Sequence, residues 1–345
     1  MKRIRVLALA SYPVEAASSR YRIVQFIEPL ARRGIDVTFS PFLDSKLFAA
    51  LYEPGKLLRQ LPRLAWRTLR RFAAVTTTAD VVFVQREAML FGPPLIEWLL
   101  RRRPMILDLD DATWVAYRSP VYGRLATLLK WPAKTDRLIR WACAVTCGSP
   151  HIAAYANGVV VPTVVDTKRF RPREMRTVNT LTIGWIGTHG TYPYLEKLLP
   201  LLDRLDVPFR LLIIGSGREQ IAGAEVRPWR LEREVEDFHE LDIGLYPLDD
   251  DDWSAGKAGF KAVQYMAAGV PFVMSPVGVC ATMGIAGETH LLARTDDEWL
   301  AALQRLATDG ALRDRISAAG RQFAVEHFDF EPQADALAAV IRKCI

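Results

Sequence analysis

LDIGLYPLDDDDWSAGKAGFKAVQYMAAGVPFVMSPVGVC, residues 241–280, is the stretch that decides the expected fold. An apolar run leads into four aspartates, a helical pattern follows at 257–268, and Gly269 ends this pattern before a second apolar run. The order strand, loop, helix and strand is typical of a parallel α/β unit, which binds ligands at the carboxyl ends of its strands. Lys257 and Lys261 fall in the first turns of the predicted helix, where unpaired N–H groups and the helix dipole favour an anion. The stretch therefore predicts a phosphate site.

Short apolar runs alternate with helical patterns on both sides of this stretch. Six runs in the amino-terminal half and two more before residue 241 have the composition of buried strands, and helical patterns separate them. A polar, basic segment, TKRFRPREMRTVN, divides the two series. This order predicts two doubly wound parallel sheets of the α/β class, in domains at 1–166 and 180–330 that are joined by a linker at 167–179.

The pattern P-L-x-D-x-x-W-x-x-G-K-x-x-x-K-x-x-Q-Y-M-A-x-G-V-P, at residues 247–271, resembles the donor-binding segment of glycosyltransferase family 4. That family consists of retaining, sugar-nucleotide-dependent transferases of GT-B fold, and the resemblance covers nearly the whole chain, most strongly 181–292. It implies GT-B architecture, in which two Rossmann-like domains face each other across a cleft. The first domain is then the acceptor side, the second binds the nucleotide-sugar donor, and a last helix at 331–345 crosses back to the first domain.

The composition favours a cytoplasmic protein with two hydrophobic cores. The chain has 345 residues, half of them apolar, which is enough for two domains of ordinary size. The amino-terminal apolar run is too short for a signal peptide, and no apolar run is long enough to span a bilayer. The cysteines match neither a redox motif nor a zinc pattern, so free thiols in a reducing cytosol are expected at Cys143, Cys147, Cys280 and Cys344.

Positive charge is concentrated in the first half of the chain. Residues 1–175 contain 28 Lys and Arg against 14 Asp and Glu, whereas residues 176–345 contain 17 against 25, and such asymmetry indicates an anionic partner. Within the basic half, KLLRQLPRLAWRTLRRFAA at 56–74 has leucines beside arginines at helical spacing, with Pro62 near its start. This segment predicts an amphipathic helix that places a peripheral membrane protein on an anionic lipid surface. The alternative is an ordinary helix with solvated arginines.

Two glycine-rich turns in the second domain are candidate donor-binding elements. GWIGTHG at 184–190 and IIGSG at 213–217 each end a predicted strand, and glycine lets backbone N–H groups approach a diphosphate closely. His189 supplies a further donor to a phosphate oxygen, and the alternative is a turn histidine in solvent. The donor-binding residues expected at these turns are Gly187, Thr188, His189, Gly215 and Gly217.

The resemblance also shows where this chain departs from the family. Family members carry an arginine and a lysine in the first loop of the second domain, and here Trp185 stands near the place of the arginine. They also carry two glutamates eight positions apart, and the corresponding residues here are Gly256 and Gln264. The carbonyl oxygen of Gln264 is still able to accept a hydrogen bond from a ribose hydroxyl. Lys257 and Lys261 are then the catalytic residues expected to stabilise charge on the leaving diphosphate.

Candidate acceptor-side residues follow two strands of the first domain. SSRYR at 18–22 is similar to the S-x-R-x-R loop of the family and places Arg20 and Arg22 at the ligand edge, with a solvated helix cap as the alternative. LDLDD at 107–111 ends a strand; Asp110 is assigned to the acceptor side, and Asp111 is the candidate that accepts the proton of the acceptor hydroxyl. A DxDD pattern also suggests Mg²⁺, but the resemblance implies a metal-independent reaction without a cofactor. The five histidines lack the paired spacing of a zinc site.

Together these patterns predict a retaining glycosyltransferase of the hexosyltransferase type. It would move a sugar from a nucleotide-sugar to a hydroxyl of a glycan or lipid-linked acceptor, and the resemblance implies a role in cell-surface polysaccharide or glycoconjugate synthesis. Two alternatives stay open: a sugar-nucleotide epimerase of the same fold, and a catalytically silent nucleotide-sugar-binding protein, which the substituted glutamates favour. Nucleic acid is not an expected partner, because the basic residues lie on helices with apolar stripes rather than among exposed stacking aromatics.

Overall fold

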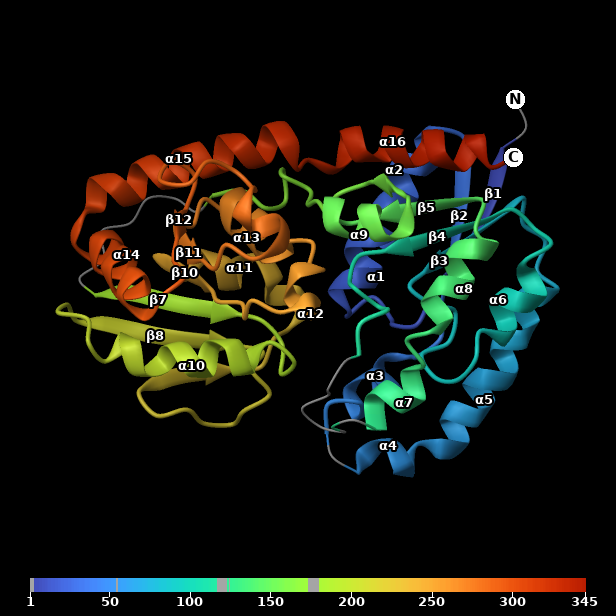
Figure 1. Ribbon diagram of the computed structural model, residues 1–345, viewed down its shortest axis with the longest axis horizontal. Coiled ribbons are helices and arrows are strands. Elements are labelled where there is room, and N and C mark those ends of the chain that lie inside the picture. The colour runs from blue at the N-terminus through green and yellow to red at the C-terminus, as the bar shows by residue number, and fades with distance from the viewer. Residues whose placement is uncertain (1–2, 54, 117–122, 124, 173–179) are drawn as a thin grey trace. The chain divides into compact units, whose positions relative to one another are not determined.

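The computed structural model describes residues 3–345 except 54, 117–122, 124 and 173–179. The chain divides into two compact units (Figure 1). Unit 1 comprises Met1–Thr163, Gly256–Ala258 and Phe330–Ile345, and unit 2 comprises Val164–Ala255 and Gly259–Asp329. Of the predicted linker, 173–179 lies outside the described residues, and the rest is grouped with unit 2.

Unit 1 contains a six-stranded parallel sheet with the order β2-β1-β3-β4-β5-β6. Its central strands are mainly apolar and buried along their whole length, as expected for parallel strands with helices on both faces. The strands are β1 (Ile4–Ala10), β2 (Ile35–Pro41), β3 (Val81–Gln85), β4 (Met105–Leu109), β5 (Ala144–Cys147) and β6 (Val159–Val160). The helical segments are α1 (Ala17–Arg22), η1 (Val24–Phe26), α2 (Ile27–Arg32), α3 (Ser45–Ala50), α4 (Lys56–Arg59), α5 (Leu61–Phe72), η2 (Ala73–Val75), α6 (Leu95–Leu100), α7 (Leu125–Lys130), α8 (Lys134–Trp141), α9 (Pro150–Ala156) and α16 (Phe330–Lys343).

Unit 2 contains a second six-stranded parallel sheet with the order β12-β11-β10-β7-β8-β9. One core cluster joins the apolar faces of β7, β8 and β10 to α10 and α14. The strands are β7 (Leu181–Ile186), β8 (Phe209–Ile214), β9 (Ala224–Arg227), β10 (Ile243–Tyr246), β11 (Phe272–Met274) and β12 (Leu291–Leu292). The helical segments are α10 (Tyr192–Leu202), η3 (Leu231–Arg233), α11 (Glu234–His239), α12 (Asp252–Ala255), α13 (Phe260–Ala267), η4 (Gly278–Ala281), α14 (Asp296–Thr308) and α15 (Gly310–His327). The two parallel sheets confirm the predicted fold class.

The last helix of the chain, α16, belongs to unit 1 and packs along α2 (Figure 1). Arg33, directly after α2, places its Nε 2.6 Å from Asp335 Oδ1, and Arg342 donates to the Arg33 carbonyl oxygen (2.7 Å). Leu337 and Ile341 are buried on the inner side of α16. Ion pairs and apolar burial therefore both hold this helix on the first unit.

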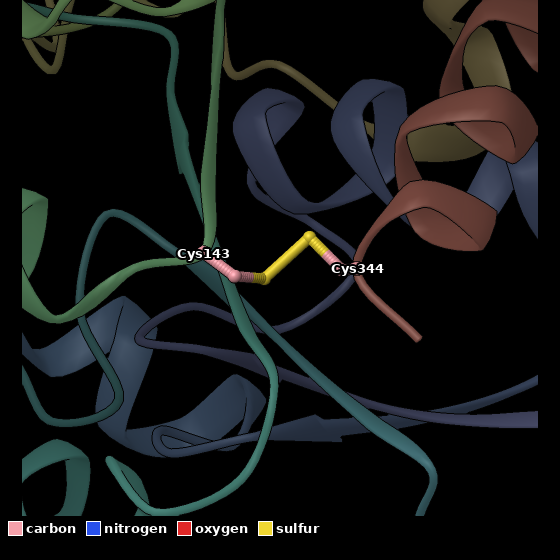
Figure 2. The surroundings of a disulfide bond; sticks show 2 residues. All are labelled: Cys143 and Cys344. Atoms are coloured by element: carbon pink, nitrogen blue, oxygen red, sulfur yellow. A yellow bond between two sulfur atoms is a disulfide. The ribbon is translucent and has the colours of Figure 1, made fainter.

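A disulfide joins Cys143 to Cys344 and corrects the prediction of free thiols at these two positions (Figure 2). Their Cα atoms are 6.0 Å apart, which is within the usual range for a disulfide. Cys143 precedes β5, and Cys344 follows α16 at a sequence separation of 201 residues. The spacing of the cysteines in the sequence does not indicate this pair, because the two residues come together only when α16 packs on unit 1. Cys147 and Cys280 are buried and are not disulfide-bonded.

Two helices differ from their predicted bounds. Helix α13 begins at Phe260, because Gly259 has φ +65°, in the left-handed region outside the helix. Lys257 therefore precedes the helix, and the prediction that it falls in the first turns of the helix is wrong. In unit 1 the predicted helix at 56–74 is divided into α4 and α5, and Pro62 lies in the first turn of α5.

Candidate functional site

Two glycine turns form the carboxyl edge of the unit 2 sheet. After β7, the N–H of Gly187 donates to the carbonyl oxygen of Ile214 (3.0 Å), at the end of β8. Gly215 follows β8 with φ +80°, and a Cβ at this position would overlap the carbonyl oxygen of Gly187. Both the left-handed backbone and the close approach require glycine. The two turns are therefore packed against each other through their backbones.

The other predicted donor-binding residues lie at the same edge. A Cβ on Gly217 would lie 3.0 Å from the Cβ of His189, so the second turn runs directly beside the first. The N–H of Thr188 donates to Thr191 Oγ1 (3.2 Å), at the start of α10. The structure thus brings together the five residues selected from the two turns, and their assignment to donor binding stays a prediction. These residues are Gly187, Thr188, His189, Gly215 and Gly217.

A chain of polar side chains connects the first turn of α13 to α11. Lys261 Nζ donates to Gln264 Oε1 (2.9 Å), and Gln264 Nε2 donates to Glu234 Oε1 (3.5 Å). Glu234 Oε2 lies 3.3 Å from Arg169 Nη2. Gln264 and Glu234 are buried, and buried polar groups require such partners. The carbonyl oxygen of Gln264, predicted to accept from a ribose hydroxyl, already accepts from Lys261.

Gly256, at the place of the first family glutamate, has no room for a side chain. A Cβ there would overlap Ala112, which belongs to the same unit. Residues 256–258 have no regular secondary structure, and Lys257 lies in the middle of them. The close approach of two backbone segments explains why a glycine, rather than a glutamate, occupies this position.

The carboxyl edge of the unit 1 sheet carries buried charges. Arg22, predicted at the ligand edge, donates to both oxygens of Asp108 (3.0 and 2.5 Å) and to the carbonyl oxygen of Val161 (2.5 Å). Thr146 Oγ1 donates to Asp108 Oδ1 (2.6 Å). Arg20 is also buried and donates to two carbonyl oxygens of its own loop. Both arginines therefore brace the loop after β1, and neither is the solvated arginine of the alternative interpretation.

A second group of charges surrounds Asp110 and Asp111. Arg86 Nε lies 2.5 Å from Asp110 Oδ1, and Arg86 Nη2 lies 2.8 Å from Asp110 Oδ2 and 3.3 Å from Asp111 Oδ2. Gln85 Nε2 donates to Asp110 Oδ1 (2.7 Å). Both oxygens of Asp110 thus have partners, whereas Asp111 Oδ1 is buried and has no hydrogen-bond partner among the described residues.

The electrostatics of this group favour the ionised carboxylate. Burial raises the pKa of Asp110, but the charge of the Arg86 guanidinium outweighs this effect, and the pKa of the carboxyl lies below its ordinary value. Burial lowers the pKa of Arg86, and the charges of Asp110 and Asp111 more than offset this, so the pKa of Arg86 is raised. The ion pair therefore persists across the whole neutral pH range.

No group of three His, Cys, Asp or Glu side chains in the described ranges is arranged to hold a metal ion. Asp110 and Asp111, at the DxDD pattern, are instead paired with Arg86. A separate cavity of about 460 Å³ lies beside β9 and α11, and in it Arg227 and Arg233 pair with Glu240. The metal independence of the reaction stays a prediction.

The chain has the GT-B fold. It contains two doubly wound units, and each has polar groups or glycine turns at the carboxyl edge of a parallel sheet. The chain is similar to the structure of a sucrose-phosphate synthase from Thermosynechococcus elongatus, at 16% identity and a TM-score of 0.70, over 98% of each chain. It is also similar to HepE from Anabaena in complex with UDP and glucose, at 15% identity and a TM-score of 0.68, over 99% of this chain and 100% of that chain.

Residues 180–309, most of unit 2, match the family model described as Glycosyl transferases group 1. No curated protein matches the chain in sequence. The family match and the fold together support a glycosyltransferase of GT-B type, and assignment to family 4 stays a prediction.

Sequence reasoning missed Arg86 and Glu234. Arg86 directly follows β3, so the rule that ligands bind at the carboxyl ends of parallel strands provides a signal for it. Glu234 lies in an acidic helix, and no pattern separates it from Glu232 or Glu236.

Proposed function

We propose that this protein is a retaining glycosyltransferase that transfers a sugar from a nucleoside diphosphate sugar to a hydroxyl of a glycan or a lipid-linked acceptor. The main support is the pair of glycine turns at Gly187 and Gly215, because they lie at the carboxyl edge of a parallel sheet, where such folds bind ligands, and in the segment that matches the family. HepE from Anabaena has been crystallised with UDP and with UDP-glucose. UDP-sugars are therefore the first donors to test.

Unit 2 supplies the proposed stabilisation of the leaving group. In a retaining transfer, negative charge develops on the diphosphate as its bond to the sugar breaks, and positive groups placed there lower the barrier. Lys261 lies in the first turn of α13 and is oriented by Gln264. Lys257, which precedes the helix and is grouped with unit 1, keeps its proposed role. The reaction is proposed to need no metal ion, because these ammonium groups and the helix N-terminus supply the positive charge.

Unit 1 supplies the proposed proton acceptor. A hydroxyl that attacks a sugar must lose its proton, and a carboxylate with an oxygen that is not already engaged is suited to accept it. Asp111 has such an oxygen, and Asp110 has both oxygens engaged. We therefore keep Asp111 as the candidate catalytic carboxylate and regard Asp110 as the residue that fixes the arrangement around it.

A screen of nucleotide-sugar hydrolysis tests this proposal. Purified protein is incubated with UDP-, GDP-, ADP- and TDP-sugars, in EDTA and in Mg²⁺, and the released sugar is followed by ¹H NMR. The proposal expects one donor class to be hydrolysed with initial release of the α-anomer from an α-linked donor, at equal rates in both buffers. Loss of turnover in EDTA with recovery in Mg²⁺ would refute metal independence. Release of epimerised nucleotide-sugar would identify an epimerase, and binding without turnover a silent binding protein.

We further propose that unit 1 docks on an anionic membrane surface. Arg63 pairs with Asp44, Arg67 donates to the carbonyl oxygen of Phe42, and Arg71 donates to that of Ser40, so these three arginines are bonded to other groups of the protein. The opposite face of α4 and α5 exposes apolar side chains instead. Leu58, Trp66 and Leu69 are 69%, 59% and 67% exposed. An exposed apolar stripe of this kind suits the interfacial region of a bilayer.

A second exposed apolar group lies on the neighbouring helix α6. Arg103, just after α6, donates to the carbonyl oxygen of Val75 (2.8 Å), so α6 lies beside the end of η2. Exposed arginines accompany both groups, which favours anionic lipid over a neutral surface by about 1 kcal/mol for each arginine near the membrane. The exposed apolar residues are Leu95, Trp98 and Leu99, and the exposed arginines are Arg59, Arg70, Arg101 and Arg102. No helix in the described ranges has the length and apolar content needed to cross a membrane.

Sedimentation with lipid vesicles tests this docking. Wild-type protein should sediment with phosphatidylglycerol vesicles at low salt and not with phosphatidylcholine vesicles, and high salt should release it. A variant that carries both Trp66→Ser and Leu69→Ser should sediment with the anionic vesicles at least tenfold less than wild type. Ile285→Ser removes an exposed apolar side chain (50% exposed) from unit 2 and should have no effect. Equal loss in the Ile285 variant, or no binding of wild type to anionic vesicles, would contradict the proposal.

A further inference from the structure

We propose that Arg86 is a positioning residue that holds Asp110 and Asp111 in one fixed arrangement, so that Asp111 presents a carboxylate oxygen to a hydroxyl-bearing acceptor. The inference rests on the proposed glycosyl transfer and names a residue that acts on it without touching the substrate. It is carried by the backbone of Arg86, by the unequal bonding of the two carboxylates, and by the charges around them.

The backbone of Arg86 has an unusual conformation. Its φ is +58°, in the left-handed region that non-glycine residues rarely adopt. The N–H of Arg86 donates to the carbonyl oxygen of Asp108 (2.8 Å), and the N–H of Glu87 donates to that of Gln85 (2.7 Å). Such a conformation costs free energy and persists where the surrounding structure enforces it, which occurs often at functional sites. Here it turns the side chain of Arg86 toward the loop that follows β4.

The two carboxylates are bonded unequally. Asp110 accepts three hydrogen bonds, two from the guanidinium of Arg86 and one from Gln85, and both of its oxygens are engaged. Asp111 has one oxygen 3.3 Å from Arg86, and its Oδ1 is buried without a partner in the part of the chain that the structure describes. A buried carboxylate oxygen without a donor is costly. A hydroxyl group supplies the missing donor, so the chemical class that fits Asp111 is an alcohol such as a sugar hydroxyl.

The charges around the pair make Arg86 the group that controls it. Asp108 is paired with Arg22, and Glu87 is paired with Lys134 (2.6 Å). The remaining neighbour is Tyr12, in the loop after β1; burial raises its pKa, and the charge of Glu87 adds to this, so the phenol stays neutral. Among the described residues, the cation bonded to both Asp110 and Asp111 is therefore Arg86.

Replacing Arg86 is expected to change both rate and pH dependence. Arg86→Gln removes the main charge that keeps the pKa of Asp110 low, so the acid limb of kcat/KM should move to higher pH. The value of kcat/KM at pH 7 should fall about tenfold to hundredfold, as expected for a lost charge-assisted hydrogen bond. Arg86→Lys keeps the charge without the planar fork that bridges two carboxylates. It should keep the acid limb near its wild-type position while kcat stays lowered.

The experiment measures hydrolysis of the active nucleotide-sugar between pH 4 and pH 9 for wild type, Arg86→Gln and Arg86→Lys. Arg3→Gln is the matched control, because Arg3 pairs with Asp36 beside the amino end of β1 and should leave the profile unchanged. An unchanged acid limb in Arg86→Gln would overturn the inference. If wild type hydrolyses no nucleotide-sugar, the proposed function fails instead. In that case ¹³C NMR titration of the aspartate carboxyls tests the inference. The inference holds if the pKa of Asp110 is higher in Arg86→Gln than in wild type, and it fails if this pKa is unchanged.

Discussion

The carboxyl edges of the two sheets are built in different ways. At the edge of unit 1, side chains of opposite charge are buried in pairs: Arg22 with Asp108, Arg86 with Asp110 and Lys134 with Glu87. At the edge of unit 2, two glycine turns are packed backbone against backbone, and Lys261 is held by the amide of Gln264. The same parallel topology thus positions its groups by buried charge in one unit and by backbone geometry in the other. The two edges should respond to different substitutions.

Removing one charge from the unit 1 edge should have the largest effect. Asp108→Ala leaves the guanidinium of Arg22 buried without its carboxylate, which should lower the free energy of unfolding by about 3–5 kcal/mol. Urea denaturation measures this change. Asp36→Ala breaks the exposed pair with Arg3 and serves as the control, with a much smaller effect. Equal losses in the two variants would remove the distinction between buried and exposed pairs.

The disulfide provides the next test, because both of its cysteines belong to unit 1. Cys344→Ser should destabilise this unit by about 2–4 kcal/mol, since the crosslink restricts the unfolded chain. Hydrogen exchange should show reduced protection in α16 and at the start of β5, and unchanged protection in the unit 2 sheet. A reducing agent should have the same effect on wild type and none on Cys344→Ser. Loss of protection in unit 2 would contradict the confinement of the crosslink to unit 1.

The comparison of edges also explains what the sequence predicted. The turns at Gly187 and Gly215 were visible because each contributes a short glycine motif after an apolar run, and the apolar runs themselves predicted both parallel sheets. The ion pairs were not visible, because Arg22 and Asp108 are 86 residues apart and only the fold brings them together. The disulfide between Cys143 and Cys344 was missed for the same reason.

The start of α13 was mispredicted for a different reason. Helical periodicity continued through residues 257–259, and the pattern gives no information on the left-handed backbone of Gly259. Glycine at this position is compatible both with a helix interior and with a cap, and only the backbone angle distinguishes the two. The position of Lys257 before the helix follows from that angle.

A glycine substitution tests the backbone edge of unit 2. Gly215→Ala should lower the free energy of unfolding by about 2–3 kcal/mol, because φ is positive and the new Cβ would overlap the Gly187 carbonyl oxygen. Gly223→Ala is the matched control, since Gly223 has φ +72° and no atom within 4 Å of the added Cβ. It measures the backbone strain alone, so the excess loss in Gly215→Ala measures the close approach. Calorimetric titration with UDP should show weaker binding to Gly215→Ala only.

The lysine of the same edge should affect turnover more than stability. Lys261→Ala should lower kcat about tenfold to hundredfold, because each charge-assisted hydrogen bond to the leaving diphosphate contributes about 1.5–3 kcal/mol. Lys257→Ala should behave in the same way. Lys197→Ala, which removes an exposed lysine paired with Asp249, is the control. Turnover at the wild-type rate in both Lys257→Ala and Lys261→Ala would show that the phosphate site has been placed wrongly.

The smallest expected effect is a difference in acid sensitivity between the units. Burial lowers the pKa of His290 in unit 2 to about 4, so between about pH 6.5 and pH 4 the unfolded chain binds a proton that the folded chain does not. The free energy of unfolding should therefore be nearly constant above about pH 7 and fall by about 1–2 kcal/mol between pH 7 and pH 5. In unit 1 the pKa of Asp110 is lowered, so the ionised carboxylate stabilises the fold at neutral pH. This contribution to the free energy of unfolding is lost only below about pH 4. His290→Gln should abolish the decrease between pH 7 and pH 5, and His327→Gln, at an exposed position on α15, should not. A decrease that persists in His290→Gln would assign the acid sensitivity to another group.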